Sequence, residues 1–173
     1  MQTGRDFFLN EEQQLAVQTI LKEWDQKDKS VYLLHGVTGS GKTEVYMELI
    51  DFVRKQSKQA IFLIPEIALT YQMVLRFYQR FGSRVSILHS RMSAGERYDQ
   101  YEKAKNGEID IMIGPRSALF TPFSNLGIII IDEEHEESYK SETVPRYHAR
   151  ETAQRRAEME GAKLILGSAT PSA

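Results

Sequence analysis

Six short apolar runs, separated by longer stretches with helical spacing, constrain the fold of this chain more than any other feature. Runs of this length suit strands that are buried in a parallel sheet. Their alternation with helical stretches is typical of βαβ units, so it predicts an α/β domain with a mostly parallel central sheet and helices on both faces. The expected strands are 31–35, 60–64, 85–88, 109–113, 128–131 and 163–166, and the expected helices between them are 42–56, 66–81, 93–105 and 147–160.

One more helix is predicted near the N-terminus. Asn10 is a favourable N-cap, and Gln13 stands three residues later, where its side chain completes a capping box. The following residues supply a rough apolar face, made of Leu15, Ile20 and Leu21. We therefore expect a helix at 10–27.

The size and composition of the chain indicate one compact domain over residues 1–173. A content of 41% hydrophobic and 27% charged residues is that of an ordinary globular protein. The longest aliphatic run, Ile128 to Ile131, is far shorter than the roughly 18 apolar residues that a membrane span needs, so a cytoplasmic location is expected. The absence of cysteine excludes disulfides and thiolate metal sites, and no zinc is expected.

The net charge of −2 argues against a protein that coats DNA through bulk positive charge. Any contact with nucleic acid must therefore be local. Exposed helix faces also carry such charges, so a solvated surface explains the basic residues equally well. The two candidate groups are Arg76, Arg80, Arg84, Arg91 and Arg97, and Lys140, Arg146, Arg150, Arg155 and Arg156.

Residues 36–43 form a complete phosphate-binding loop of the Walker A type, G-x-x-x-x-G-K-[ST], between an apolar run and a helix. Lys42 is expected to reach the β- and γ-phosphates, and the Thr43 hydroxyl to bind Mg²⁺. Backbone N–H groups of the loop and the start of the helix would surround the phosphates. These groups belong to Gly36, Val37, Thr38, Gly39, Ser40 and Gly41. A chance match to a glycine-rich turn is the alternative.

An acidic pair follows the buried run at 128–131. Asp132 and Glu133 are expected to emerge at the carboxyl edge of the sheet, where ligands of open α/β sheets bind. Asp132 is placed to hold Mg²⁺ through water, and Glu133 to orient and deprotonate the attacking water. The alternative is a polar strand end whose acids are merely solvated.

Several segments resemble superfamily 2 helicases, and more specifically the bacterial replication-restart helicases. Asp132 to His135 (DEEH) matches motif II, and the Gly-Ser-Ala-Thr of 167–170 matches the Ser-Ala-Thr of motif III. The other matching segments follow the family order along nearly the whole chain. They are GVTGSGKTEV (36–45), PEIALT (65–70), HS (89–90), GER (95–97), GPRSALF (114–120), YK (139–140), PRYHAR (145–150) and GSATPS (167–172).

The resemblance implies the first RecA-like motor lobe of a 3′-to-5′ DNA helicase acting in replication restart and primosome assembly. It implies that Gln13, in the Gln motif, reads the adenine edge, although a role in the capping box alone competes with this. It places Thr70, Arg116 and Ser117 along the DNA backbone. As loop residues, these three could equally cap helices.

The same resemblance implies that His135, Ser168 and Thr170 connect the nucleotide site to DNA. For His135, the alternative is a buried histidine with hydrogen bonds that serve the structure alone. The segment 136–150 is expected to couple DNA binding to hydrolysis through Tyr139 and Lys140, because it combines rings for stacking with cations for phosphates. Tyr147 and Arg150 could instead simply begin the next helix.

Full-length members of that family carry parts that these 173 residues lack: a second motor lobe with an arginine finger, an N-terminal DNA-binding region and a zinc-binding insertion. The chain is therefore expected to be the ATP-binding lobe alone. It should bind ATP or ADP with Mg²⁺ but turn ATP over poorly, because an arginine finger contributes on the order of 10³-fold or more to catalysis. The implied partners are forked or single-stranded DNA, the second lobe, and primosome and single-strand-binding proteins.

Two other functions remain open at this stage. One is a nucleic-acid translocase of another superfamily 2 branch, such as a restriction-enzyme motor or an RNA helicase, against which the PRYHAR and PEIALT segments argue. The other is a scaffold that senses ATP without turnover, which would have no need of Glu133 as a base.

Overall fold

A computed structural model describes residues 9–34, 41–132 and 146–167. The described residues form one six-stranded sheet in the order β1-β6-β5-β2-β4-β3, and every pairing in it is parallel. The predicted α/β class and parallel sheet are therefore confirmed. The strands are β1 (Val31–Leu34), β2 (Gln59–Leu63), β3 (Val85–Ile87), β4 (Ile111–Gly114), β5 (Leu126–Asp132) and β6 (Lys163–Gly167).

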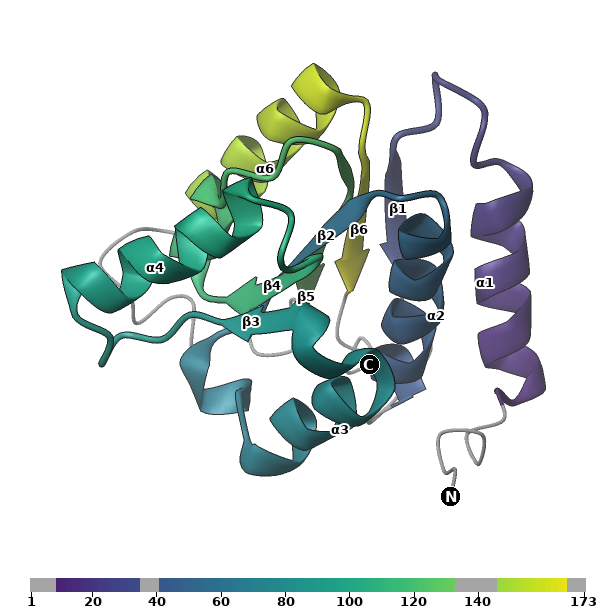
Figure 1. Ribbon diagram of the computed structural model, residues 1–173. Coiled ribbons are helices and arrows are strands. Elements are labelled where there is room, and N and C mark those ends of the chain that lie inside the picture. The colour runs from purple at the N-terminus through teal and green to yellow at the C-terminus, as the bar shows by residue number, and fades with distance from the viewer. Residues whose placement is uncertain (1–8, 35–40, 133–145, 168–173) are drawn as a thin grey trace.

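Helices cover the two faces of the sheet (Figure 1). On one face lie α1 (Glu11–Lys22), α2 (Gly41–Lys55) and α3 (Tyr71–Phe81); on the other lie α4 (Ala94–Lys105) and α6 (Arg146–Glu160). Strand residues alternate between two buried clusters, as the twofold repeat of a strand requires. In β5, for example, Ile128 and Ile130 join the cluster beneath α2, whereas Ile129 and Ile131 join the cluster beneath α6.

Strand β1 departs from the expectation that both faces are covered. Leu34 is buried against the cluster beneath α2, and Tyr32 packs against that cluster from its border. Val31 and Leu33, which alternate with them, are exposed. Among the described residues, one face of this edge strand therefore stays open.

The N-terminal helix is shorter than predicted. Asn10 caps α1 with the expected capping box, but the helix ends at Lys22 rather than at residue 27. After the helix, the backbone hydrogen bonds join residues three apart instead of four. Trp24 N–H donates to Leu21 O, and Gln26 N–H donates to Glu23 O. The Lys163 ammonium donates to the carbonyls of Gln26 and Lys29, so this turn is held by contacts that are remote in sequence.

The predicted helix 66–81 is two elements. A short 3₁₀ helix, η2 (Glu66–Ala68), precedes α3, and the extended residue Thr70 separates them. The Thr70 hydroxyl accepts a hydrogen bond from Met73 N–H at 3.2 Å, which makes Thr70 the N-cap of α3. Two further 3₁₀ helices, η3 (Gly82–Arg84) and η4 (Arg116–Phe120), precede β3 and follow β4.

The remaining boundaries differ from prediction by a few residues. Strand β4 begins at Ile111 rather than at residue 109, and Arg84 holds the carboxylate of the preceding residue, Asp110. Strand β5 extends the apolar run at both ends. None of the helices in the described ranges is long and apolar enough to cross a membrane.

Candidate nucleotide site

The carboxyl ends of three neighbouring strands meet at one point of the sheet edge. Leu34 of β1 pairs with Gly167 of β6, and Gly167 pairs with Asp132 of β5. Strand β6 therefore lies between the strand that precedes the phosphate-binding loop and the strand that carries the acidic pair. The carboxyl edge of a parallel sheet is where ligands of such folds bind.

The first turn of α2 brings two predicted site residues to this edge. Gly41 begins the helix, and the side chains of Lys42 and Thr43 are buried. Lys42 Nζ lies 3.8 Å from Asp132 Oδ1, and the two side chains are only 2% and 9% exposed. The sequence predicted that these residues serve the same site, and the structure brings them together.

Tyr46 is a member of this site that the sequence reasoning missed. Its hydroxyl donates a hydrogen bond to Asp132 Oδ1 at 3.3 Å, and the residue is fully buried. The signal in the sequence was its spacing, because residues four apart lie on the same face of a helix. Tyr46 stands four residues after Lys42, so both side chains reach the same carboxylate.

Gln13 connects α1 to the start of α2. Its Oε1 accepts from Asn10 N–H at 2.8 Å, which confirms the capping box, and its Nε2 donates to the Gly41 carbonyl at 3.0 Å. Gln13 is buried, beside Gly41 of the phosphate-binding loop. This position is compatible with the predicted adenine contact, which stays a prediction.

Many predicted site residues lie outside the described residues. They are the loop residues Gly36, Val37, Thr38, Gly39 and Ser40, the base Glu133, and the coupling residues His135, Tyr139, Lys140, Ser168 and Thr170. Their predicted roles stay predictions.

The three predicted DNA contacts lie beyond the carboxyl ends of β2 and β4. Thr70 caps α3 and is exposed, so its hydroxyl proton is still free to point away from the helix. Arg116 and Ser117 begin η4, and the Ser117 carbonyl accepts a hydrogen bond from the Tyr101 hydroxyl at 2.8 Å. The capping alternative is therefore correct for Thr70, without excluding a contact to phosphate.

Several arginines proposed for DNA instead hold the domain together. Arg76 pairs with Glu44 and Arg80 with Glu48, which joins α3 to α2. Arg84 makes a bidentate pair with Asp110, and Arg156 donates to the carbonyls of Leu119 and Phe123 in and after η4. For these four arginines, structural contacts account for the side chain.

A second contact near this edge joins two loops that match family motifs. The Glu66 carboxylate accepts hydrogen bonds from the backbone N–H of Ser90 at 2.6 Å and from its hydroxyl at 2.8 Å. The backbone hydrogen bond from Ser90 is the main cause that lowers the pKa of Glu66. The segment after β2 is thereby fixed to the segment after β3.

The oxygen donors at the edge fit Mg²⁺ shared with a nucleotide. No cluster of three or more His, Cys, Asp or Glu side chains that could hold a metal by itself occurs within residues 9–34, 41–132 and 146–167. A nucleotide-bound Mg²⁺ needs fewer protein ligands, because phosphate oxygens and water complete its octahedral shell. Thr43 and Asp132 offer a hydroxyl and a carboxylate of the kind that this ion prefers.

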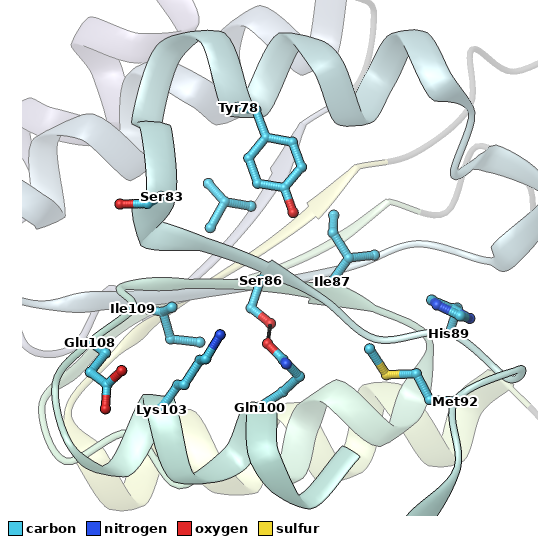
Figure 2. Close-up of a pocket in the computed structure, with 11 residues that line it drawn as sticks. Tyr78, Ser83, Ser86, Ile87, His89, Met92, Gln100, Lys103, Glu108 and Ile109 are labelled. Atoms are coloured by element: carbon cyan, nitrogen blue, oxygen red, sulfur yellow. Dashed lines mark hydrogen bonds between the residues drawn. The ribbon is translucent and has the colours of Figure 1, made fainter. Parts of the chain in front are cut away.

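A cavity of about 560 Å³ lies elsewhere, beside the edge strand β3 (Figure 2). Tyr78 of α3 enters it from one side, and Gln100 and Lys103 of α4 from the other. None of the residues that line it is a predicted site residue, and β4 and β2 separate β3 from β5. The cavity is therefore distinct from the candidate nucleotide site.

The sequence is similar to replication restart proteins from several bacteria. It is 54% identical over 164 residues to "Replication restart protein PriA" of Bacillus subtilis (strain 168), covering 95% of this chain and 20% of that protein. The same protein of Chlamydia trachomatis is 50% identical over 165 residues, covering 95% of this chain and 22% of the relative. The chain thus spans about a fifth of the length of these relatives.

The solved "Structure of RecG bound to three-way DNA junction" has a similar fold, with a TM-score of 0.71 and 27% identity, over 95% of this chain and 21% of that one. This likeness confirms the predicted RecA-like fold of helicase motor domains. Residues 6–173 match the family described as "Type III restriction enzyme, res subunit". With nearly its whole length matched, the chain belongs to this family.

Proposed function

We propose that this chain is the ATP-binding motor lobe of a 3′-to-5′ DNA helicase that acts in replication restart. The observation that carries the proposal is the meeting of buried Lys42 and Asp132 at the carboxyl edge of the sheet. Both residues belong to motifs that are typical of proteins that bind a nucleoside triphosphate. The relatives named as replication restart proteins support the biological role.

In the proposed site, each residue has one role. Gly36 to Gly41 supply backbone N–H groups to the phosphates, and Lys42 moves from Asp132 toward the β- and γ-phosphates. Thr43 and, through water, Asp132 would hold Mg²⁺, which neutralises charge on the phosphate oxygens. Glu133 orients the attacking water and takes its proton.

DNA is the proposed partner of the face formed by the loops after β2 and β4, through Thr70, Arg116 and Ser117. The RecG relative was solved with a three-way DNA junction, which supports branched or forked DNA as the substrate. Coupling to hydrolysis is assigned to His135, Tyr139, Lys140, Ser168 and Thr170. The second motor lobe, primosome proteins and single-strand-binding proteins are the proposed protein partners, in the cytoplasm.

Nucleotide binding can be tested by thermal unfolding with ADP and Mg²⁺. A ligand at about 100 times its Kd stabilises the native state by about 2.7 kcal/mol. For a domain of this size, this corresponds to a rise in Tm of roughly 5–10 °C. Lys42→Ala should lose most of the rise, because it removes the charge that faces the phosphates.

Lys55→Ala is the matched control, because Lys55 lies on the same helix but is exposed and pairs with Asp51 one turn earlier. It should keep the full rise in Tm. Equal shifts in Lys42→Ala and wild type would show that the phosphates bind elsewhere.

A further inference from the structure

We propose that Tyr46 is a positioning residue that holds the Asp132 carboxylate for the Mg²⁺-nucleotide. This inference rests on the proposed function and assigns a role to a residue outside the phosphate-binding loop and the acidic pair. Its starting point is that the Tyr46 hydroxyl and the Lys42 ammonium approach the same oxygen, Asp132 Oδ1, at 3.3 and 3.8 Å.

Packing fixes the place of the Tyr46 ring. The ring lies against Phe62, with ring centroids 5.3 Å apart and an interplanar angle of 59°. On the side of β6 it passes so close to Gly167 that a Cβ atom there would overlap the Tyr46 hydroxyl. Only glycine leaves room at this position, so the absence of a side chain on β6 lets a residue of α2 reach β5.

Lys42 and Tyr46 are expected to respond differently when nucleotide binds at the proposed site. Lys42 carries a positive charge that the phosphates attract, so its contact with Asp132 weakens in the bound state of the proposed site. Tyr46 is neutral and lies outside the phosphate-binding loop, so the phosphates do not attract its side chain. It can therefore keep the carboxylate oriented throughout.

A neutral donor also suits a carboxylate that serves a cation. A nearby ammonium offsets the negative charge that attracts Mg²⁺, whereas a phenolic hydroxyl orients the carboxylate and leaves that charge in place. Groups that orient metal-binding side chains in this way commonly change metal affinity about 10- to 100-fold when they are removed.

The test compares ADP affinity with Mg²⁺ and with EDTA in wild type, in Tyr46→Phe and in Tyr101→Phe. Tyr101→Phe is the control, because it also removes a partly buried hydroxyl, the one that donates to Ser117 O. We expect Tyr46→Phe to lower the enhancement of ADP affinity by Mg²⁺ about tenfold. Its affinity in EDTA should match that of wild type, and Tyr101→Phe should keep the full enhancement.

A second variant moves the Tyr46 hydroxyl instead of removing it. Gly167→Ala keeps the Tyr46 hydroxyl but displaces it, since the new methyl group would occupy its place. It should reduce the Mg²⁺ enhancement as Tyr46→Phe does. All titrations are made well below the Tm of each variant.

Three results would overturn the inference. An unchanged Mg²⁺ enhancement in Tyr46→Phe, or in Gly167→Ala, would show that the hydroxyl does not position Asp132. Equal losses of ADP affinity with Mg²⁺ and with EDTA would assign Tyr46 a purely structural role. If wild type bound no ADP under either condition, the proposed function would fail, and this inference with it.

Discussion

The Gln13 side chain makes two hydrogen bonds, one with Asn10 N–H and one with Gly41 O, which give it a structural role apart from its predicted role in nucleotide recognition. Gln13→Ala removes the capping box and the bond to Gly41 O, so we expect it to lower the free energy of unfolding by about 1–2 kcal/mol. If Gln13 also reads adenine, the variant should lose affinity for ADP more than for GDP. Nucleotide titrations and thermal unfolding measure both effects.

Gln14→Ala serves as the control, since the Gln14 side chain is next to Gln13 in the sequence but is exposed and donates to Leu9 O. It should leave the discrimination between ADP and GDP unchanged. An equal loss of ADP and GDP affinity in Gln13→Ala would reduce Gln13 to a helix cap that supports the loop.

Among single residues, the sequence predicted those site residues that belong to a recognisable motif, and it missed the one whose role depends on packing. Lys42 and Asp132 follow from the phosphate-binding loop and from the acidic end of a buried run. In the sequence alone, Tyr46 resembles the other buried residues of an amphipathic helix. Its role depends on Gly167 lying opposite, which only the pairing of strands reveals.

Among the elements, we expect the link between η2 and the turn after β3 to be sensitive to acid. The hydrogen bonds from Ser90, first that from its backbone N–H, lower the pKa of Glu66 below its ordinary value. The ionised carboxylate is therefore favoured in the folded state, and its contribution to stability is present above that value. It is lost as the pH falls through the lowered pKa.

We expect Glu66→Gln to remove this part of the acid sensitivity, because the amide oxygen still accepts from Ser90 but does not titrate. Chemical unfolding of wild type and variant between pH 6 and pH 3 measures the difference. Parallel loss of stability in both proteins would mean that other carboxylates account for the acid response.

The split of the predicted helix 66–81 has the same physical origin as this link. Helical spacing runs through the segment, but Thr70 satisfies its capping preference with an extended backbone, and Glu66 is drawn to Ser90. Apolar periodicity does not register either effect. Nor does it register the contacts of Lys163 with the turn after α1 and of Arg84 with Asp110, which join residues far apart in the sequence.

For the whole molecule, the parallel sheet was predictable from the alternation of runs, whereas the strand order was not. The order depends on which runs pair, and any of the buried runs is apolar enough to occupy the centre.

The described residues build a single sheet, and in motors of the proposed type a second lobe supplies an arginine to the phosphates. We therefore expect this chain alone to hydrolyse ATP at least about 10³-fold more slowly than a full-length replication restart protein.

Steady-state phosphate release, with and without forked DNA, tests that expectation. Turnover near that of the full-length relative would mean that copies of the chain associate and supply an arginine to each other. A dependence of the specific activity on protein concentration would reveal such association.

The place of β6 has a consequence for how the protein is made. A ribosome delivers β1 first and β6 last among the six strands, yet β6 is the strand that joins β1 to β5. Until residue 167 has left the exit tunnel, a nascent chain lacks the strand that joins β1, which leads toward Lys42 in α2, to β5, which ends at Asp132. We therefore expect the proposed nucleotide site to be among the last parts of the described fold to form, so that nucleotide would stabilise the chain only after its synthesis has passed β6.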